Sequence, residues 1–210
     1  MSASYSKSTL LYEQVRRALQ SGRYLPGQWI DPSLLATEFN TSLTPIRLAL
    51  HRLVGAGLLE DHARGGMHVP LPNEIAMRDL YDWMEHLLLI ACEIGTSPLP
   101  HATAEGLEAI SPDDDLVKLT WQLFDAIASA TAQSALHQAV KRTNDQLAPI
   151  RRGKQHLLEH SFDELSELIR HWHARDYPTL SYALRGYHAR RKKLVPCIVA
   201  ALIERRDSLR

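Results

Sequence analysis

The stretch TSLTPIRLALHRL, residues 41–53, places apolar residues at helical spacing directly behind a short polar turn. Thr44 suits the N-cap of this helix, and Pro45 suits its first position because a proline there loses no intrahelical hydrogen bond. Gly55 and Gly57 mark its end. One face is apolar: Ile46, Ala49, Leu50, Leu53 and Val54. The pattern predicts an amphipathic helix that packs on other elements.

Two helices are expected before it. Residues 9–20 carry apolar side chains at helical spacing. Asp31 as N-cap and Pro32 as first residue open a shorter helix, which ends at Asn40, a residue type that tolerates the left-handed region. The short connection 40–43 is typical of the turn in a helix-turn-helix motif.

A β-hairpin is expected after the third helix. Two short apolar runs, residues 58–60 and 67–69, are joined by a polar turn that contains Gly65 and Gly66. Three helices followed by a hairpin is the order of a winged helix-turn-helix domain. We therefore predict such a domain for residues 1–72.

The same residues resemble the signature of the GntR family of bacterial regulators. The resemblance lies in SGRYLPGQWI (residues 21–30), LATEF (35–39) and the stretch 41–53. It implies a DNA-binding domain whose third helix enters the major groove. Where relatives carry an arginine after the serine of the turn, this chain has Leu43, which can contact only a thymine methyl.

Each predicted DNA contact has a chemical reason. Arg47 lies one turn into the third helix, where a bidentate contact to guanine is possible, and Thr44 offers a hydroxyl to a phosphate. Arg52 lies further along and is expected at the DNA backbone, and Arg64 is expected at the wing tip. The full predicted DNA-binding set is Ser42, Leu43, Thr44, Arg47, Arg52, Arg64, Gly65 and Gly66.

Composition places few limits on function. The 210 residues are 45% hydrophobic and carry formal net charge zero, and residues 1–72 hold seven basic against five acidic residues. The two cysteines are too few for a disulfide framework or metal ribbon. No apolar run is long enough to span a membrane, and no secretory signal is evident. We therefore expect a cytoplasmic protein without a membrane partner.

The remainder, residues 73–210, shows only helical patterns after a stiff linker at residues 70–72. We predict a mostly α protein in which an all-α antiparallel bundle follows the winged domain. The expected helices are residues 75–95, 103–110, 113–129, 134–150, 161–175, and 177–206 with a bend at Pro196. The aromatic and methionine side chains are assigned to the core: Trp83, Met84, Trp121, Phe124 and Trp172.

DLYDWME (residues 79–85) and the segment 168–188 resemble the FadR-type effector domain called FCD. The resemblance implies a carboxylate effector held by a divalent metal on one aspartate and three histidines, with an arginine on the first helix. Carried over, those positions hold Met84, Trp121 with Asp125, and Leu165, and only His188 keeps a ligand. We therefore expect no metal, no cofactor and a more apolar effector. The predicted effector-binding residues are Trp83, Met84, Trp121, Asp125 and His188.

Three interpretations remain open. The favoured one is a homodimeric regulator, not an enzyme, that binds a pseudo-palindromic double-stranded operator and responds to a small-molecule effector. In the second, the helical domain is only a dimerisation scaffold. The third is a metal-dependent hydrolase built on His156, Glu159 and His160. The basic runs 151–154 and 190–193 are interpreted as an exposed connection and a solvated helix face.

Overall fold

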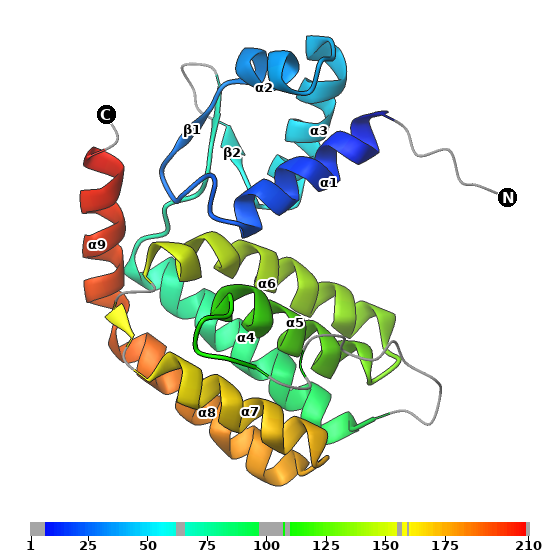
Figure 1. Ribbon diagram of the computed structural model, residues 1–210, viewed down its shortest axis with the longest axis vertical. Helices are drawn as coiled ribbons and strands as arrows, with labels where there is room; N and C mark the ends of the chain where they lie inside the picture. Colours follow the sequence, from blue (N-terminus) through cyan, green and yellow to red (C-terminus); the bar gives the residue numbers. More distant parts are fainter. Residues whose placement is uncertain are drawn as a thin grey trace, which may run out of the picture.

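The computed structural model describes residues 7–61, 66–96, 107, 110–154, 157–158 and 160–208. Its elements form an amino-terminal winged-helix part above a helical bundle (Figure 1). The prediction of a mostly α fold with a small β wing is confirmed. The elements of the winged-helix part are α1 (Lys7–Gln20), β1 (Trp29–Ile30), α2 (Pro32–Glu38), α3 (Leu43–Gly55), β2 (Glu60–Asp61) and β3 (Met67–His68).

Local sequence sets the ends of α2 and α3. The Asp31 side chain accepts a hydrogen bond from the backbone N–H of Ser33 at 2.7 Å and caps α2. Asn40 has a φ of 46°, which turns the chain toward α3. The expectation that Thr44 caps α3 is wrong. The helix begins at Leu43, and Ser42 is its N-cap. Pro45 is the third residue of the helix and is tolerated there because backbone N–H groups in the first turn have no intrahelical acceptor.

The wing is a three-stranded antiparallel sheet in the order β1-β3-β2. The expected hairpin pairs β2 with β3, with Asp61 opposite Met67. The sequence analysis missed β1, which pairs with the other edge of β3 and places Ile30 opposite Met67. This strand joins the wing to the α1–α2 connection.

The core of the winged-helix part consists of apolar residues between positions 11 and 69. Leu11, Val15 and Leu19 of α1 pack on the buried face of α3, in which Ile46 and Leu50 are fully buried. Burial of such side chains contributes roughly 1.5–3 kcal/mol each to the free energy of unfolding. The predicted apolar face of α3 is therefore the face that holds this part together.

The bundle is built from α4 (Glu74–Ile94), α5 (Leu116–Ser129), α6 (Ser134–Gly153), α7 (Ser161–His173), α8 (Tyr177–Lys193) and α9 (Val195–Asp207). The last two replace the single long helix that was expected. Pro196 has no N–H to donate, and its ring conflicts with a continuous helix, so the chain breaks at Leu194. α5 begins three residues later than expected because Asp115 caps it. The helix expected at 103–110 falls almost entirely outside the described residues.

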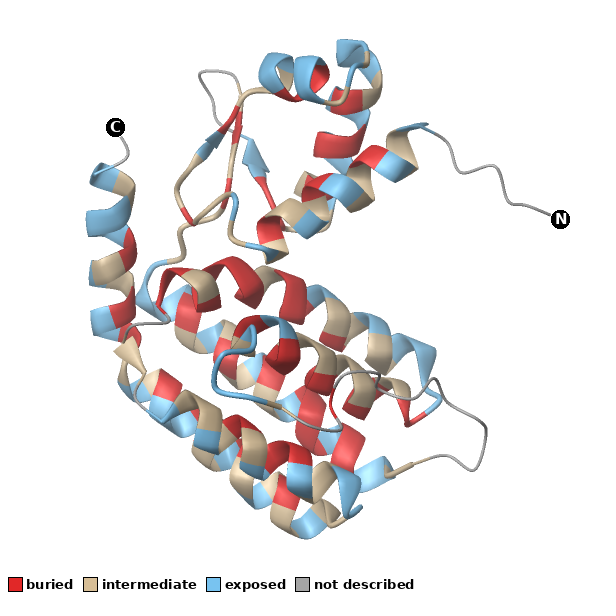
Figure 2. Ribbon diagram, in the orientation of Figure 1, coloured by how far each residue is buried: buried red, intermediate tan, exposed pale blue. Residues whose placement is uncertain are grey.

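A second core fills the bundle, from Met77 to Leu202, and buried residues line the facing sides of the helices (Figure 2). The core assignment holds for Met84 and Phe124, which are fully buried. It is wrong for Trp83, whose side chain is 52% exposed. Trp121 and Trp172 are partly buried. α9 packs on α4 and α6 through Val195, Ile198 and Leu202, and its carboxyl end runs up beside the winged-helix part (Figure 1).

Candidate nucleic-acid interface

The amino-terminal turn of α3 is open to solvent. Ser42, Leu43 and Thr44 are exposed, and Ser42 makes no side-chain cap hydrogen bond. α2 and the start of α3 lie at the end of the molecule remote from α7 and α8 (Figure 1). The first turn of a helix carries backbone N–H groups without intrahelical partners, so it attracts anions such as a DNA phosphate.

Arg47 lies on the solvent side of α3 together with Thr44, Leu48 and His51, at helical spacing. Within the described part of the chain, its guanidinium has no hydrogen-bond or ion-pair partner, so all five donors are available. Leu43 and Leu48, which are 37% and 53% exposed, add apolar surface on either side. This face combines the guanidinium N–H donors of Arg47, which can bind guanine, with leucine methyl groups, which can contact the methyl group of thymine.

Arg52 has a different environment. Its guanidinium lies over the ring of Tyr12, 4.7 Å from the centroid, and its Nη1 donates to Thr9 Oγ1 at 3.2 Å. Both partners belong to α1. A role of Arg52 at the DNA backbone stays a prediction, and its established contact is the packing of α3 on α1.

Gly66 anchors the wing. It has a φ of 95°, and a Cβ there would lie 1.8 Å from Cζ2 of Trp29, so the indole of β1 covers the glycine. Only glycine fits this backbone and this contact. Arg64 and Gly65 lie outside the described residues. In the sequence, the one indication of β1 is the apolar pair Trp29-Ile30 shortly after the Pro26-Gly27 turn.

The carboxyl end of α3 is tied to the bundle by α6. Arg142 Nε donates to the Ala56 carbonyl at 3.0 Å, and Gln146 Nε2 donates to the Gly57 carbonyl at 3.3 Å. These carbonyls belong to the C-cap residue of α3 and the residue after it, at the helix end that carries partial negative charge. Side chains of α6 therefore donate hydrogen bonds at the carboxyl end of the candidate recognition helix.

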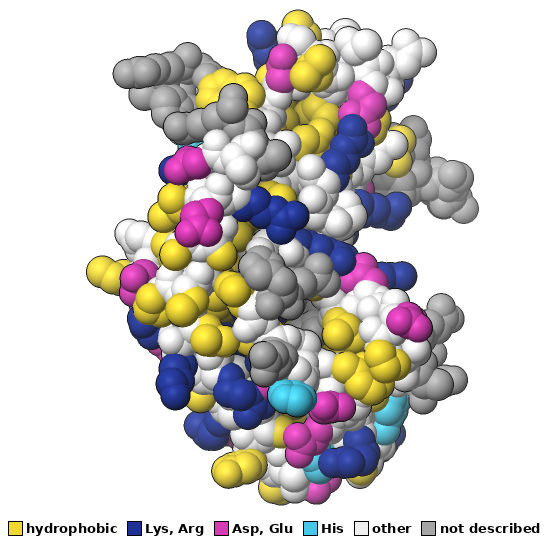
Figure 3. Space-filling model, turned by 60° about the vertical axis from the view of Figure 1, so that its left-hand side comes forward, with side chains coloured by type: hydrophobic (Ala, Val, Ile, Leu, Met, Phe, Trp, Pro, Cys, Tyr) yellow, Lys and Arg dark blue, Asp and Glu magenta, His cyan; other side chains and the backbone are white. Residues whose placement is uncertain are grey.

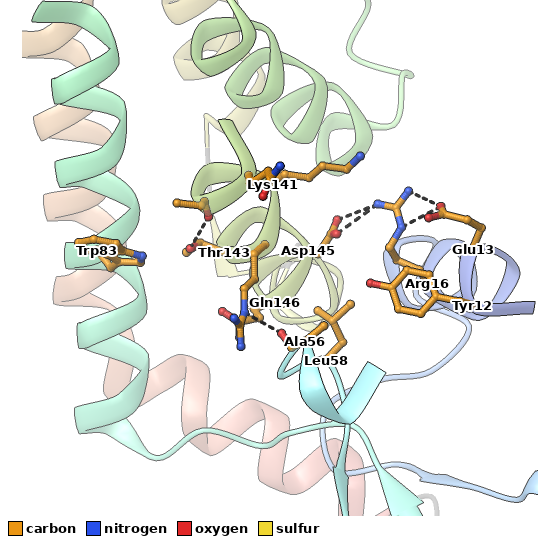
Figure 4. A pocket seen from close by; sticks show the side chains of 13 residues that line it. Tyr12, Glu13, Arg16, Ala56, Leu58, Trp83, Lys141, Thr143, Asp145 and Gln146 are labelled. Carbon is orange, nitrogen blue, oxygen red and sulfur yellow. Dashed lines mark hydrogen bonds and ion pairs between the residues drawn. The ribbon is translucent and has the colours of Figure 1, made fainter. Parts of the chain in front are cut away.

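A second contact joins α1 to α6 through a buried carboxylate. Figure 4 shows Arg16 between Glu13 of its own helix and Asp145, with Arg16 Nη1 3.1 Å from Asp145 Oδ2. Asp145 also accepts from Gln20 at 2.6 Å and from Trp121 Nε1 at 2.8 Å. Burial raises the pKa of Asp145 above its usual range, against the opposing effect of Arg16.

The predicted effector residues are not brought to one place. Trp83 borders a cavity of about 760 Å³ at the junction, and Trp121 borders a separate one of about 300 Å³. Met84 is fully buried in the core. Asp125 lies 2.8 Å from Nε2 of His137. His188 is fully buried, and its Nδ1 lies 2.8 Å from the Leu184 carbonyl oxygen.

Histidines of the bundle are dispersed. His156 and Glu159 lie outside the described residues. His160 is exposed, with a φ of 59°, and lies 3.5 Å from Asp163. Among the residues whose placement is given, no three His, Cys, Asp or Glu side chains are grouped as metal ligands would be. Likewise, no described helix is long and apolar enough to cross a membrane.

The geometry defines a winged helix-turn-helix DNA-binding domain attached to a helical bundle. Residues 7–69 match the model of the bacterial regulatory proteins of the gntR family, so this domain belongs to the GntR family. Residues 7–69 are accordingly a DNA-binding domain of the kind that GntR-type bacterial regulators carry.

Two solved structures share the whole architecture. E. coli McbR/YncC is 16% identical, with a TM-score of 0.66 over 91% of this chain and 97% of its own. A GntR protein from Rhodococcus sp. RHA1 is 17% identical, with a TM-score of 0.64 over 91% and 98%. At these identities the likeness shows the fold. No curated protein sequence matches the chain.

Proposed function

We propose that two copies of this chain bind a pseudo-palindromic operator, each reading one half-site with the amino-terminal face of α3. The observation that carries the proposal is the free guanidinium of Arg47, exposed between Leu43 and Leu48 on the face of α3 opposite its buried side. A single helix reads only a few base pairs, so specificity requires two half-sites and hence a dimer.

The exposed side of α4 supports dimer formation. Trp83, Ile90 and Ile94 are 52%, 43% and 41% exposed, and their spacing places them on one line along the helix. Figure 3 shows hydrophobic side chains in several groups on one face of the molecule, among charged side chains. Exposed apolar stripes of this kind mark protein contacts. We assign this stripe to the contact with a second copy of the chain.

The dimer is tested by light scattering. Ile90→Asp places a charge on the stripe and is expected to give a monomer at concentrations where the wild-type chain is a dimer. Ile75→Asp is the matched control, because Ile75 is 73% exposed on the same helix but off the stripe. A wild-type monomer, or equal masses for all three proteins, would contradict the assignment.

We propose residues 1–72 as the DNA-binding domain and residues 73–210 as the domain that dimerises and binds a small effector. The operator is found by incubating the purified chain with fragmented genomic DNA and sequencing what it retains. The expected result is one enriched motif with two inverted halves. The control variant Arg185→Ala, at an exposed arginine of α8, should still enrich this motif, and Arg47→Ala should not. Enrichment without inverted halves, or equal enrichment by Arg47→Ala, would contradict the proposal.

A further inference from the structure

Three cationic side chains are buried together at the end of α6 and in α8. Arg151, Lys154 and Arg191 are 5%, 1% and 3% exposed. All three border a pocket of about 270 Å³ between α5, α6, α7 and α8. The sequence analysis interpreted both of their basic runs as exposed, and for these three residues that interpretation is wrong. We call them the basic cluster.

Among the described residues, one carboxylate, that of Glu164, pairs with the basic cluster. Arg191 Nη2 lies 2.6 Å from Oε2 of Glu164, which also pairs with Arg190 at the surface. Lys154 Nζ donates to the Tyr81 hydroxyl at 2.5 Å. Arg151 Nη1 donates to Asn144 Oδ1 at 2.6 Å. Across the described chain, no carboxylate contacts Arg151 or Lys154, and a buried cation without a counter-charge is costly.

Arg151 keeps one edge of its guanidinium unused. Its Nε and Nη2 are buried and have no hydrogen-bond partner. These two N–H groups point the same way and match the two oxygens of a carboxylate or phosphate. The remaining lining includes apolar side chains, Leu116, Val117, Leu158 and Phe162. The pocket thus has a cationic side and an apolar side.

We propose that this pocket binds a small organic anion, with its carboxylate or phosphate on Arg151 and Lys154 and a short apolar body against α5 and α7. The volume equals that of roughly nine waters at about 30 Å³ each, which fits a small acid. The inference rests on the proposed effector binding and departs from the expectation of a more apolar effector. The charge comes from the chain itself, so binding requires no metal.

The state of Lys154 supports the proposal. Burial, together with the charges of Arg191 and Arg151, lowers the pKa of Lys154 well below its usual value. A bound anion stabilises the ammonium form and raises that pKa again. Anion binding is therefore expected to take up a proton from the buffer.

The test uses the full chain without DNA, so its outcome is independent of operator binding. Melting is followed with butyrate, butyl phosphate and butyramide, the last being a neutral analogue of butyrate. We expect one or both anions to raise the melting temperature progressively with concentration, and butyramide to have no effect. The two anions separate carboxylate from phosphate recognition. An equal response to butyramide, or no response to either anion, would overturn the proposal.

Variants locate the effect. Lys154→Met removes a buried amine whose charged form is costly and keeps an apolar stem, so without ligand the variant should melt no lower than wild type, and it should lose the anion response. Lys193→Met, an exposed lysine of α8, should keep the wild-type response. A Lys154→Met protein that responds like wild type would place binding elsewhere.

Calorimetry of the wild-type chain covers the case in which Lys154→Met does not fold. The binding heat should differ between buffers of unequal ionisation enthalpy, in the direction of proton uptake. Equal heats would contradict binding at Lys154.

Discussion

Leu43 stands where the resemblance to the family leads one to expect an arginine, and its side chain is 37% exposed at the first position of α3. It has no hydrogen-bonding group, so its contribution to base recognition is limited to contact with the thymine methyl. The operator of this chain is therefore expected to differ from those of relatives at the corresponding base pair.

Replacing thymine by uracil in the operator tests this residue directly. At one position in each half-site, loss of the methyl should weaken wild-type binding by roughly 1 kcal/mol, at the lower end of single-contact effects. Leu43→Ala should bind the two operators equally, and Leu34→Ala, exposed on α2, should still distinguish them. Fluorescence anisotropy gives the affinities. A methyl effect that survives in Leu43→Ala would assign that contact to another residue.

His188 predicts a pH dependence of stability. Complete burial lowers its pKa to about 3. The unfolded chain binds a proton at this residue below about pH 6.5 and the folded chain does not, so stability falls as the pH falls from 6.5 toward 3. The slope from this residue is at most about 1.4 kcal/mol per pH unit.

Urea unfolding at several pH values measures that slope. His188→Gln should lose the contribution and unfold with a shallower acid dependence than wild type. The exposed His86 supplies the control, His86→Gln, which should follow the wild-type curve. Parallel curves for wild type and His188→Gln would show that the folded and unfolded chains bind protons equally at His188, and would contradict the prediction.

Among the secondary-structure elements, the helices with strong apolar periodicity could be predicted from the sequence. Features that depend on contacts between residues far apart in the chain could not. α3 and its exposed face followed from capping residues and apolar spacing. β1 was missed because two residues form no recognisable period, and its pairing with β3 is a tertiary contact. The basic cluster was missed because charge in a sequence predicts exposure, whereas burial of Lys154 depends on α4 and α8 folding over it.

α6 contacts the winged-helix part, and its Asp145 accepts hydrogen bonds from Arg16, Gln20 and Trp121. Asp145→Asn replaces the oxygen that accepts from Arg16 with an NH2 donor and is expected to lower the free energy of unfolding by about 1.5–3 kcal/mol, the range for hydrogen bonds to charged groups. Urea unfolding measures the loss. Asp113→Asn, exposed before α5, should stay within about 0.5 kcal/mol of wild type. An unchanged Asp145→Asn would mean that this contact does not hold α1 to the bundle.

In the whole molecule, α6 offers a physical route by which ligand binding in the bundle can affect DNA binding by α3. Its residues Arg142 and Gln146 hold the end of α3, Arg152 Nε donates to the Gln20 carbonyl at 3.0 Å, and Arg151 faces the pocket. Neighbouring residues of one helix thus contact the proposed anion and α1. Anion binding that shifts α6 would change the position of α3.

The coupling is measured by titrating operator with and without the anion that stabilises the chain. The operator affinity should change in wild type, and operator should change the anion affinity by the same factor. Lys154→Met should show one operator affinity under both conditions. An anion that binds but leaves the operator affinity unchanged would contradict coupling between the pocket and the DNA-binding domain.

Methylation protection at guanine N7 in the operator measures directly whether the amino-terminal face of α3 reads base edges. We expect one protected guanine in each half-site, with the two half-sites about 34–36 Å apart or a multiple of that distance. Protection should disappear with Arg47→Ala and persist with Arg185→Ala. Guanines that remain protected in the Arg47→Ala complex, or an operator without protected guanines, would contradict it.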